Sequence, residues 1–210
     1  DGRKLIGICM IIDVRARRGH FLHLRHGPVL SKFTSKYFDQ LISYVKIIAK
    51  DVGADFLRIS PVVKDSEKNR TFLKRRGFVP SPLHRMDAED CWVLDLDKSE
   101  DELLMGMRKT TRYLVRKGEK DGVTIERAQS SKDAKVFSNI YQKTAYKHGF
   151  LPHRGIVEEF EIFKKDNLVE LFLAKYRGKT AAAALIIFYG DQAVYHHGAS
   201  NPKYDRLSPS

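Results

Sequence analysis

The sequence predicts an α/β (α+β) fold in which mixed, mostly antiparallel sheets are flanked by helices. Two observations predict it. Segments rich in β-branched residues and bounded by turn residues indicate strands and hairpins. They alternate with segments in which apolar residues recur at helical spacing. Such alternation is typical of sheets whose faces are covered by helices.

The first half of the chain is expected to form a hairpin, two further strands and two helices. The apolar periodicity of each helix stops at a glycine, Gly53 for the first and Gly77 for the second, as is common at helix ends. Pro61 terminates the strand that lies between them. The expected strands cover residues 4–14, 21–25, 56–60 and 91–96, and the expected helices cover residues 38–52 and 67–76.

The second half is expected to begin with one long helix over residues 99–122. Ser99 and Glu102 have the spacing of a capping box at its start, and Gly122 is a typical stop at its end. Strands then follow over 123–128, 168–176, 180–189 and 192–197, with helices over 131–147 and 156–165.

The long helix carries a basic stripe, because Arg108, Arg112, Arg116 and Lys120 recur at every fourth residue. At 3.6 residues per turn these cations share one face. The apolar residues of the adjoining arc are expected to pack on the protein; they are Leu103, Leu104, Met107, Thr111, Leu114 and Val115. Because arginine binds phosphate oxygens bidentately, the stripe favours a phosphate-bearing partner. The alternative is a solvated, charge-rich helix face with no ligand.

The overall charge agrees with a polyanionic partner. The chain of 210 residues has a net charge of +12 and a calculated pI near 9.7. Nucleic acid, a nucleotide diphosphate and an anionic membrane surface all fit this charge. The sequence has no run of about 20 apolar residues that could span a bilayer. A cytoplasmic location is expected, with peripheral contact with the inner face of the membrane as an open alternative.

The histidines and cysteines predict neither a metal site nor a catalytic nucleophile. His20, His23 and His26 would not all face one way on a strand, and His196 and His197 are expected on opposite faces. No serine, cysteine or acidic residue stands at a distance that suggests a catalytic triad. The two cysteines lack metal-ligand spacing, which fits a reducing compartment. No Walker loop or dinucleotide fingerprint occurs, so no cofactor is expected.

An internal repeat is suggested by two similar stretches. Gly2-Arg3, an apolar strand and His23-Leu24-Arg25-His26-Gly27 occur in the same order as Gly178-Lys179, an apolar strand and Tyr195-His196-His197-Gly198. We interpret this as two copies of one sheet-and-helix unit. Because the chain starts at Asp1 within an apparent sheet, it is expected to be a fragment that cuts both copies.

Several short motifs resemble acyltransferase families. The helix that ends at Gly77-Phe78 is similar to the last helix of GNAT-type acyltransferases, but their coenzyme A loop, Gln/Arg-x-x-Gly-x-Gly/Ala, follows neither hairpin. A larger, ordered set resembles the FemABX family of peptidoglycan bridge-forming aminoacyltransferases. Its members are Trp92-Val93-Leu94-Asp95-Leu96, Met107-Arg108-Lys109-Thr110-Thr111-Arg112-Tyr113, Tyr141-x-x-Thr144-Ala145-x-x-x-Gly149-Phe150, Leu173-Ala174-x-Tyr176-x-Gly178-Lys179 and Tyr195-x-x-Gly198-Ala199-Ser200.

The resemblance implies two tandem GNAT-like domains, truncated at both ends. Residues 1–97 would be the C-terminal part of the first domain, and residues 98–210 the basic helix and the N-terminal part of the second. It also implies transfer of an amino acid from aminoacyl-tRNA to the stem-peptide amine of lipid II or UDP-MurNAc-pentapeptide, without coenzyme A. The long helical arm of some members is not expected here.

The resemblance also implies roles for particular residues. Lys109, Arg112, Tyr113 and Arg116 would bind the diphosphate of the precursor, and Tyr195 would belong to the acceptor channel. The family's transition-state-stabilising lysine is expected beyond residue 210, so the catalytic residue is unknown here. Two alternatives remain open: a coenzyme A-dependent N-acetyltransferase of the same fold, and a non-catalytic RNA-binding module. The amino acid transferred, the acceptor position and the oligomeric state are not predicted.

Overall fold

The computed structural model describes residues 4–17, 19–82, 87 and 91–207. The chain divides into two compact units, Asp1–Leu94 and Asp95–Ser210. The division falls close to the predicted domain boundary after residue 97. That these units are parts of two successive GNAT-like domains stays a prediction.

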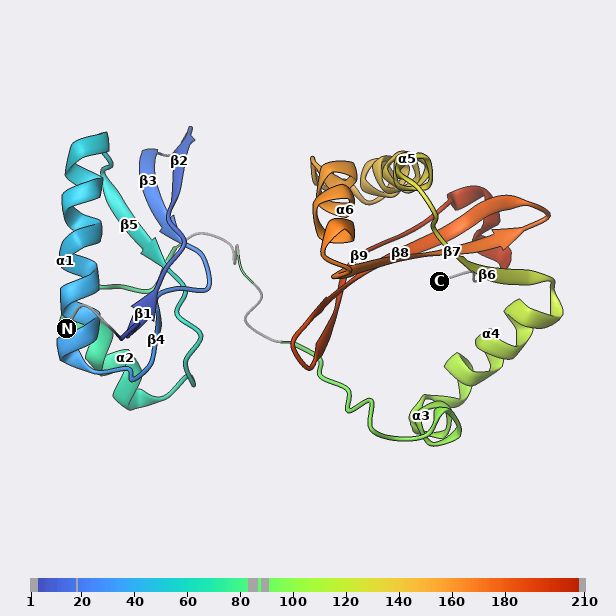
Figure 1. Ribbon diagram of the computed structural model, residues 1–210, viewed down its shortest axis with the longest axis horizontal. Coiled ribbons are helices and arrows are strands. Elements are labelled where there is room, and N and C mark those ends of the chain that lie inside the picture. Colours follow the sequence, from blue (N-terminus) through green and yellow to red (C-terminus); the bar gives the residue numbers. More distant parts are fainter. Residues whose placement is uncertain (1–3, 18, 83–86, 88–90, 208–210) are drawn as a thin grey trace. The chain divides into compact units, whose positions relative to one another are not determined.

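The first unit combines two small sheets with two helices (Figure 1). β2 (Ile12–Ala16) and β3 (Gly19–Leu24) pair antiparallel, as the predicted hairpin requires, and β5 (Phe56–Ile59) lies parallel to β3 on its other side. α1 (Ser35–Val52) connects β3 to β5, and α2 (Glu67–Lys74) follows. β1 (Gly7–Ile8) and β4 (Val29–Leu30) form a separate antiparallel pair. The expected strand over residues 4–14 is therefore divided between two sheets.

The core of the first unit lies between α1 and the β2–β3–β5 sheet. The apolar face of α1 supplies Phe38, Ile42, Val45 and Ala49, all of which are buried together with Leu22 and Leu24 of β3. Their helical spacing is the one that predicted the helix. Gly53 ends α1 in the left-handed region, at a φ of 72°, where a glycine carries no steric penalty.

The second unit has an antiparallel sheet of four strands. Its order is β6 (Val123–Arg127), β7 (Val169–Tyr176), β8 (Lys179–Tyr189) and β9 (Gln192–Ser200), and all neighbours pair antiparallel. α5 (Ser131–His148) and α6 (Ile156–Lys165) connect β6 to β7. After β9 the chain forms the short 3-10 helix η1 (Pro202–Leu207). The predicted fold class is confirmed, since each unit is a mixture of sheet and covering helices.

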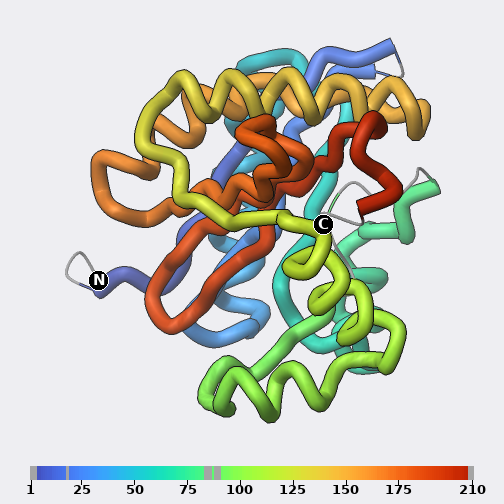
Figure 2. The backbone as a smooth tube through the Cα atoms, turned by 90° about the vertical axis from the view of Figure 1, so that its right-hand side faces the viewer, coloured from blue at the N-terminus to red at the C-terminus, as the bar shows by residue number. Residues whose placement is uncertain are grey.

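α5 and α6 cover one face of this sheet (Figures 1 and 2). Their apolar residues and the inward residues of β7 and β8 form a continuous core around Phe137, Phe160, Leu171 and Leu185, which are almost fully buried. None of the helices that the structure describes is long and apolar enough to cross a membrane.

The predicted helix over residues 99–122 is wrong, because the structure contains two helices there. α3 (Glu100–Gly106) begins with the predicted capping box of Ser99 and Glu102, and α4 (Lys109–Lys120) starts only after a break. Met107 and Arg108 have extended backbone at the break, with ψ of 157° and 146°. Gly106 disfavours a continuous helix at this point. Arg108 is the N-cap residue of α4, so it does not belong to the helical stripe.

The predicted strand over residues 91–96 is also wrong. These residues have no regular structure, and their side chains are exposed; Trp92 is 96% exposed. The apolar composition indicated a strand, but a strand also needs a neighbour to pair with. In the part of the chain that the structure describes, the ladders do not include this segment.

Candidate functional site

The predicted diphosphate-binding residues lie together on α4. Arg112 and Tyr113 follow Lys109 by three and four residues and precede Arg116 by four and three, so all four residues project from one side of the helix. Lys109, Tyr113 and Arg116 are exposed, whereas Arg112 is half-buried. The side chain of Arg108, the N-cap residue, makes no capping hydrogen bond, so it does not occupy the first backbone amides of α4. The positive end of the helix dipole lies beside Lys109 and Arg112 in the first turn, whereas Arg116 is about two turns further along the helix.

Arg112 has a structural contact that the sequence did not predict. Its Nη1 donates to the carbonyl oxygens of Met105, at 3.1 Å, and of Met107. These carbonyls lie at the end of α3, where the helix leaves them without helical partners. Arg112 thus stabilises the break between α3 and α4, and part of its donor capacity is already used. Arg116 makes no hydrogen bond or ion pair with another described residue, which leaves its guanidinium available.

The apolar side of α4 is not packed as predicted. Leu114 and Val115 are 39% and 42% exposed, and Gly118 is the one residue of this helix that is buried among those described. α4 contacts the edge strand β6 through few residues. At its C-terminal end, Lys117 pairs with Asp121 and lies 3.5 Å from the carbonyl oxygen of Arg206. Lys117 is therefore held at the junction with η1 and is less available than Arg116.

Tyr195 lies on β9, away from the helix residues in the sequence and in its contacts. The described residues show no hydrogen bond or ion pair between Tyr195 and the four α4 residues. The Tyr195 side chain is 66% exposed as a whole. Its hydroxyl lies over Gly198, so close that a Cβ added there would be 1.6 Å from the oxygen. Partial burial nevertheless raises the pKa of Tyr195 above its usual value.

The prediction that His196 and His197 face opposite sides of a strand is wrong. The register of β9 shifts opposite Leu185 and Ile186, so that His197 pairs with Leu185 while Tyr195 pairs with Ile186. His196 is the extra residue of this β-bulge, which interrupts the normal alternation. Both imidazoles consequently reach Glu159 of α6: His196 Nε2 lies 2.8 Å from Oε1, and His197 Nε2 lies 3.3 Å from Oε2.

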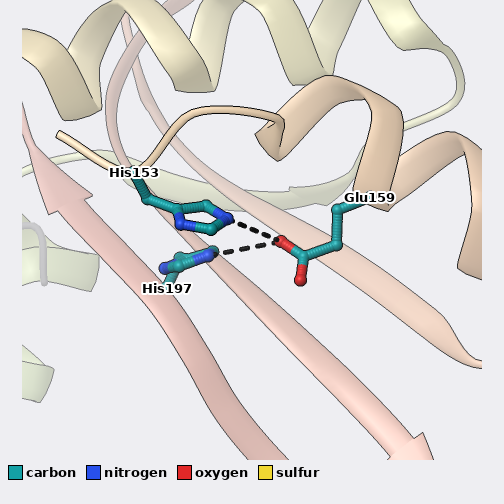
Figure 3. Close-up of side chains that lie close together, drawn as sticks. All are labelled: His153, Glu159 and His197. Carbon is teal, nitrogen blue, oxygen red and sulfur yellow. Dashed lines mark ion pairs between the residues drawn. The ribbon is translucent and has the colours of Figure 1, made fainter. Parts of the chain in front are cut away.

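A third histidine completes this cluster, which sequence reasoning missed. His153, in the segment between α5 and α6, places its Nε2 at 3.8 Å from Glu159 Oε2 (Figure 3). Burial, followed by the charge of His196, lowers the pKa of His197 and outweighs the opposing effect of Glu159. The adjacent histidines at 196 and 197 were a sequence signal for such a cluster. The β-bulge that brings both of them to Glu159 could not be predicted from the sequence.

A known protein family matches most of the second unit. Residues 105–210, half of the chain, match the model of an acetyltransferase (GNAT) domain. The chain therefore belongs to the GNAT-domain family. The predicted resemblance to the FemABX family agrees with the curated relatives described next, and the solved structure shows the same fold.

Two curated relatives are the proteins called Lipid II:glycine glycyltransferase from two strains of Staphylococcus epidermidis. Each is 27% identical to this chain over 167 residues, which is 75% of this chain and 40% of the relative. The chain thus spans less than half the length of these relatives. The crystal structure of FemX superimposes with a TM-score of 0.76 at 18% identity, covering 99% of this chain and 71% of FemX. This likeness establishes the shared fold.

Proposed function

We propose that the protein containing this chain transfers an amino acid from aminoacyl-tRNA to the stem-peptide amine of a peptidoglycan precursor, either lipid II or UDP-MurNAc-pentapeptide. The product would be the peptide that bridges neighbouring strands of the cell wall. The observation that carries this proposal is the similarity to lipid II:glycine glycyltransferases across three quarters of the chain. The exposed cations of α4 support it, because the precursors contain a diphosphate.

The chemistry of such a transfer fits the residues present. An aminoacyl ester is already activated, so the protein has to align the amine with the ester carbonyl and stabilise the developing oxyanion. No covalent nucleophile is required. Two polyanions, the tRNA and the precursor, must reach one site, and a net charge of +12 attracts both. Recognition of the tRNA would depend on its shape and its acceptor end more than on duplex base edges.

The contacts of α4 support different roles for its cations in this proposal. Lys109 at the N-terminus of the helix and Arg116 about two turns further along are both exposed, and both suit a phosphate ligand along this side of α4. Tyr113, 63% exposed, adds a hydroxyl on the same side. Arg112 contributes mainly by holding the start of α4 against the end of α3. Arg116 is therefore a cleaner probe of phosphate binding than Arg112.

The decisive experiment measures transfer of labelled glycine, alanine or serine from charged tRNA to lipid II and to UDP-MurNAc-pentapeptide by the full-length protein. Transfer of at least one of these amino acids is expected. Absence of transfer with all three amino acids and both acceptors would overturn the proposal.

Arg116→Ala tests the assignment of the phosphate site. A hydrogen bond to a charged group contributes about 1.5–3 kcal/mol, so precursor affinity is expected to fall about tenfold or more. Lys135→Ala, which removes an exposed cation from α5, serves as the matched control and leaves affinity nearly unchanged. Equal affinities for the two variants would show that α4 does not bind the diphosphate.

A second candidate is a coenzyme A-dependent N-acetyltransferase, which the match to an acetyltransferase domain favours. The sequence lacks the pyrophosphate loop of such enzymes after both hairpins. Calorimetry with acetyl-CoA separates the two candidates. Stoichiometric binding of acetyl-CoA would support this second function, and our first proposal predicts that none occurs.

A further inference from the structure

The histidine–glutamate cluster of the second unit has the composition and the geometry of a metal site. We propose that His153, Glu159 and His197 bind a divalent transition-metal ion, for which Zn²⁺ is the best match. This inference is independent of the proposed transfer reaction, since the cluster shares no residue with the basic side of α4.

The three ligand atoms converge from three separate segments. His153 comes from the segment between α5 and α6, Glu159 from the first turns of α6 and His197 from the bulge of β9 (Figure 3). One imidazole nitrogen from each histidine and one carboxylate oxygen lie within 4.8 Å of one another. These segments belong to the well-packed unit that contains the core around Phe137 and Phe160.

The two histidine–carboxylate distances are close to those around a tetrahedral ion, and the two histidine nitrogens lie within 4.8 Å of each other. Zinc bonds of about 2.0–2.2 Å to nitrogen and oxygen place neighbouring ligand atoms about 3.3–3.5 Å apart. The distance from His197 Nε2 to Glu159 Oε2 is 3.3 Å, and that from His153 Nε2 to the same oxygen is 3.8 Å. A shift of His153 by a few tenths of an ångström brings the second pair into range. His153 can make that shift, because its side chain is 47% exposed and lies outside the helices.

The pairing of the buried atoms provides an independent argument. Glu159 Oε2 and His197 Nε2 are both buried, yet neither has a hydrogen-bond partner among the described residues. They approach each other at 3.3 Å without forming a hydrogen bond. Their ion pair leaves a buried carboxylate oxygen and a buried ring nitrogen without a hydrogen bond of good geometry, which is costly. An ion coordinated by both atoms would remove this cost.

The surroundings hold the ligands in position. His196 Nε2 lies 2.8 Å from the other carboxylate oxygen of Glu159 and so fixes the orientation of the carboxylate. The ring of Tyr141 packs edge-on against His197, with centroids 5.5 Å apart. Partners that orient a ligand in this way are typical of metal sites and tune the affinity.

The ligand types select the class of metal. Two imidazoles and one carboxylate suit zinc and its neighbours in the first transition row, whereas Mg²⁺ and Ca²⁺ prefer sites made of oxygen. Three protein ligands leave a fourth position for solvent or an external ligand. The alternative is a hydrogen-bonded cluster without metal, in which His196 pairs with Glu159 Oε1.

The test uses the whole chain after removal of metals with a chelator. Calorimetric titration with ZnSO4 at neutral pH is expected to give one equivalent of bound zinc, and Co²⁺ is expected to give the visible absorption of a tetrahedral complex. His153→Ala and Glu159→Gln are each expected to weaken zinc binding at least tenfold. His148→Ala removes an exposed histidine of α5 outside the cluster and is expected to change nothing.

His153 is the most informative position, since its exposed side chain can be removed without disturbing the core. The thermal midpoint of the unsubstituted chain is expected to rise with zinc, and that of Glu159→Gln to stay constant. Binding weaker than about 100 µM, or binding equally tight in all three variants, would overturn the proposal and leave the hydrogen-bonded cluster. Both readouts are obtained without any transfer assay, so their failure is distinguishable from failure of the proposed function.

Discussion

Replacing Gly198 by alanine should move the Tyr195 side chain without unfolding the protein. A Cβ at position 198 would lie 1.6 Å from the Tyr195 hydroxyl oxygen and 2.5 Å from Cζ, where ordinary contact begins at 3.4 Å. The hydroxyl must therefore move by about 1.8 Å. The atom in the way is the far end of a side chain that is 66% exposed, so the ring can rotate into solvent.

The expected cost in stability is small. The backbone of Gly198 does not lie in the left-handed region, so alanine fits its conformation. Replacing glycine at such a site stiffens the unfolded chain and stabilises by about 0.4–1 kcal/mol, which offsets the lost contact of the tyrosine ring. We expect a change in the free energy of unfolding of less than about 1 kcal/mol.

The pKa of Tyr195 reports the movement directly. In the unsubstituted chain burial raises this pKa, because the phenolate is disfavoured away from water. In Gly198→Ala the pKa should fall back toward the ordinary tyrosine value near 10. A pH titration by NMR with 13C at tyrosine Cζ measures it, with the Tyr195 signal assigned from Tyr195→Phe.

The control is Gly118→Ala, because nothing lies within 4 Å of a Cβ at that position of α4. It should leave the titration of Tyr195 unchanged. If Gly198→Ala is folded and the pKa of Tyr195 stays raised, the hydroxyl does not lie over Gly198 and the reasoning fails.

Two further predictions concern stability. Phe137→Ala should lower the free energy of unfolding of the second unit by about 3–5 kcal/mol in urea denaturation, because Phe137 is completely buried. The control is Val136→Ala, which truncates an exposed neighbouring side chain. If Phe137→Ala costs no more stability than Val136→Ala, this prediction is wrong. The first unit should weaken in acid through Asp87: burial raises the pKa of this carboxyl, but hydrogen bonds from Ser60 and Arg25 and the charge of His23 together lower it below the ordinary value. The stabilisation is present above the ordinary pKa of about 3.9 and is lost as the pH falls through the lower native pKa. Urea unfolding should therefore show that the unsubstituted chain is more stable than Asp87→Asn at pH 6, and that this difference in unfolding free energy is smaller at pH 3. A difference that is the same at both pH values would refute the role of Asp87.

Most of the helices and strands could be predicted from the sequence, because their signals act over a few residues. The apolar spacing from Phe38 to Ala49 and the stop at Gly53 are confirmed in α1. The capping box of Ser99 and Glu102 is confirmed at the start of α3. The ordered motifs that resemble FemABX proteins were sufficient to indicate the family, since they depend on residue identity and order alone.

The errors occurred where the local residue pattern alone did not decide the structure. Residues 91–96 have the composition of a strand but no partner in the described ladders. Residues 99–122 were predicted as one helix, yet Gly106 weakens that helix and Arg112 donates to the carbonyls exposed by its break. The four-residue spacing of the basic residues could not predict this contact of Arg112.

The sequence by itself determined the fold class, the resemblance to the FemABX family, the basic face of α4 and the net charge that attracts polyanions. The tertiary structure alone decided which of those cations are free, and it alone brought His153, Glu159 and His197 together. The physical reason is that helix formation and net charge follow from neighbouring residues and composition. The convergence of the cluster depends on the register of β9 against β8, where one bulged residue changes the direction of every side chain that follows.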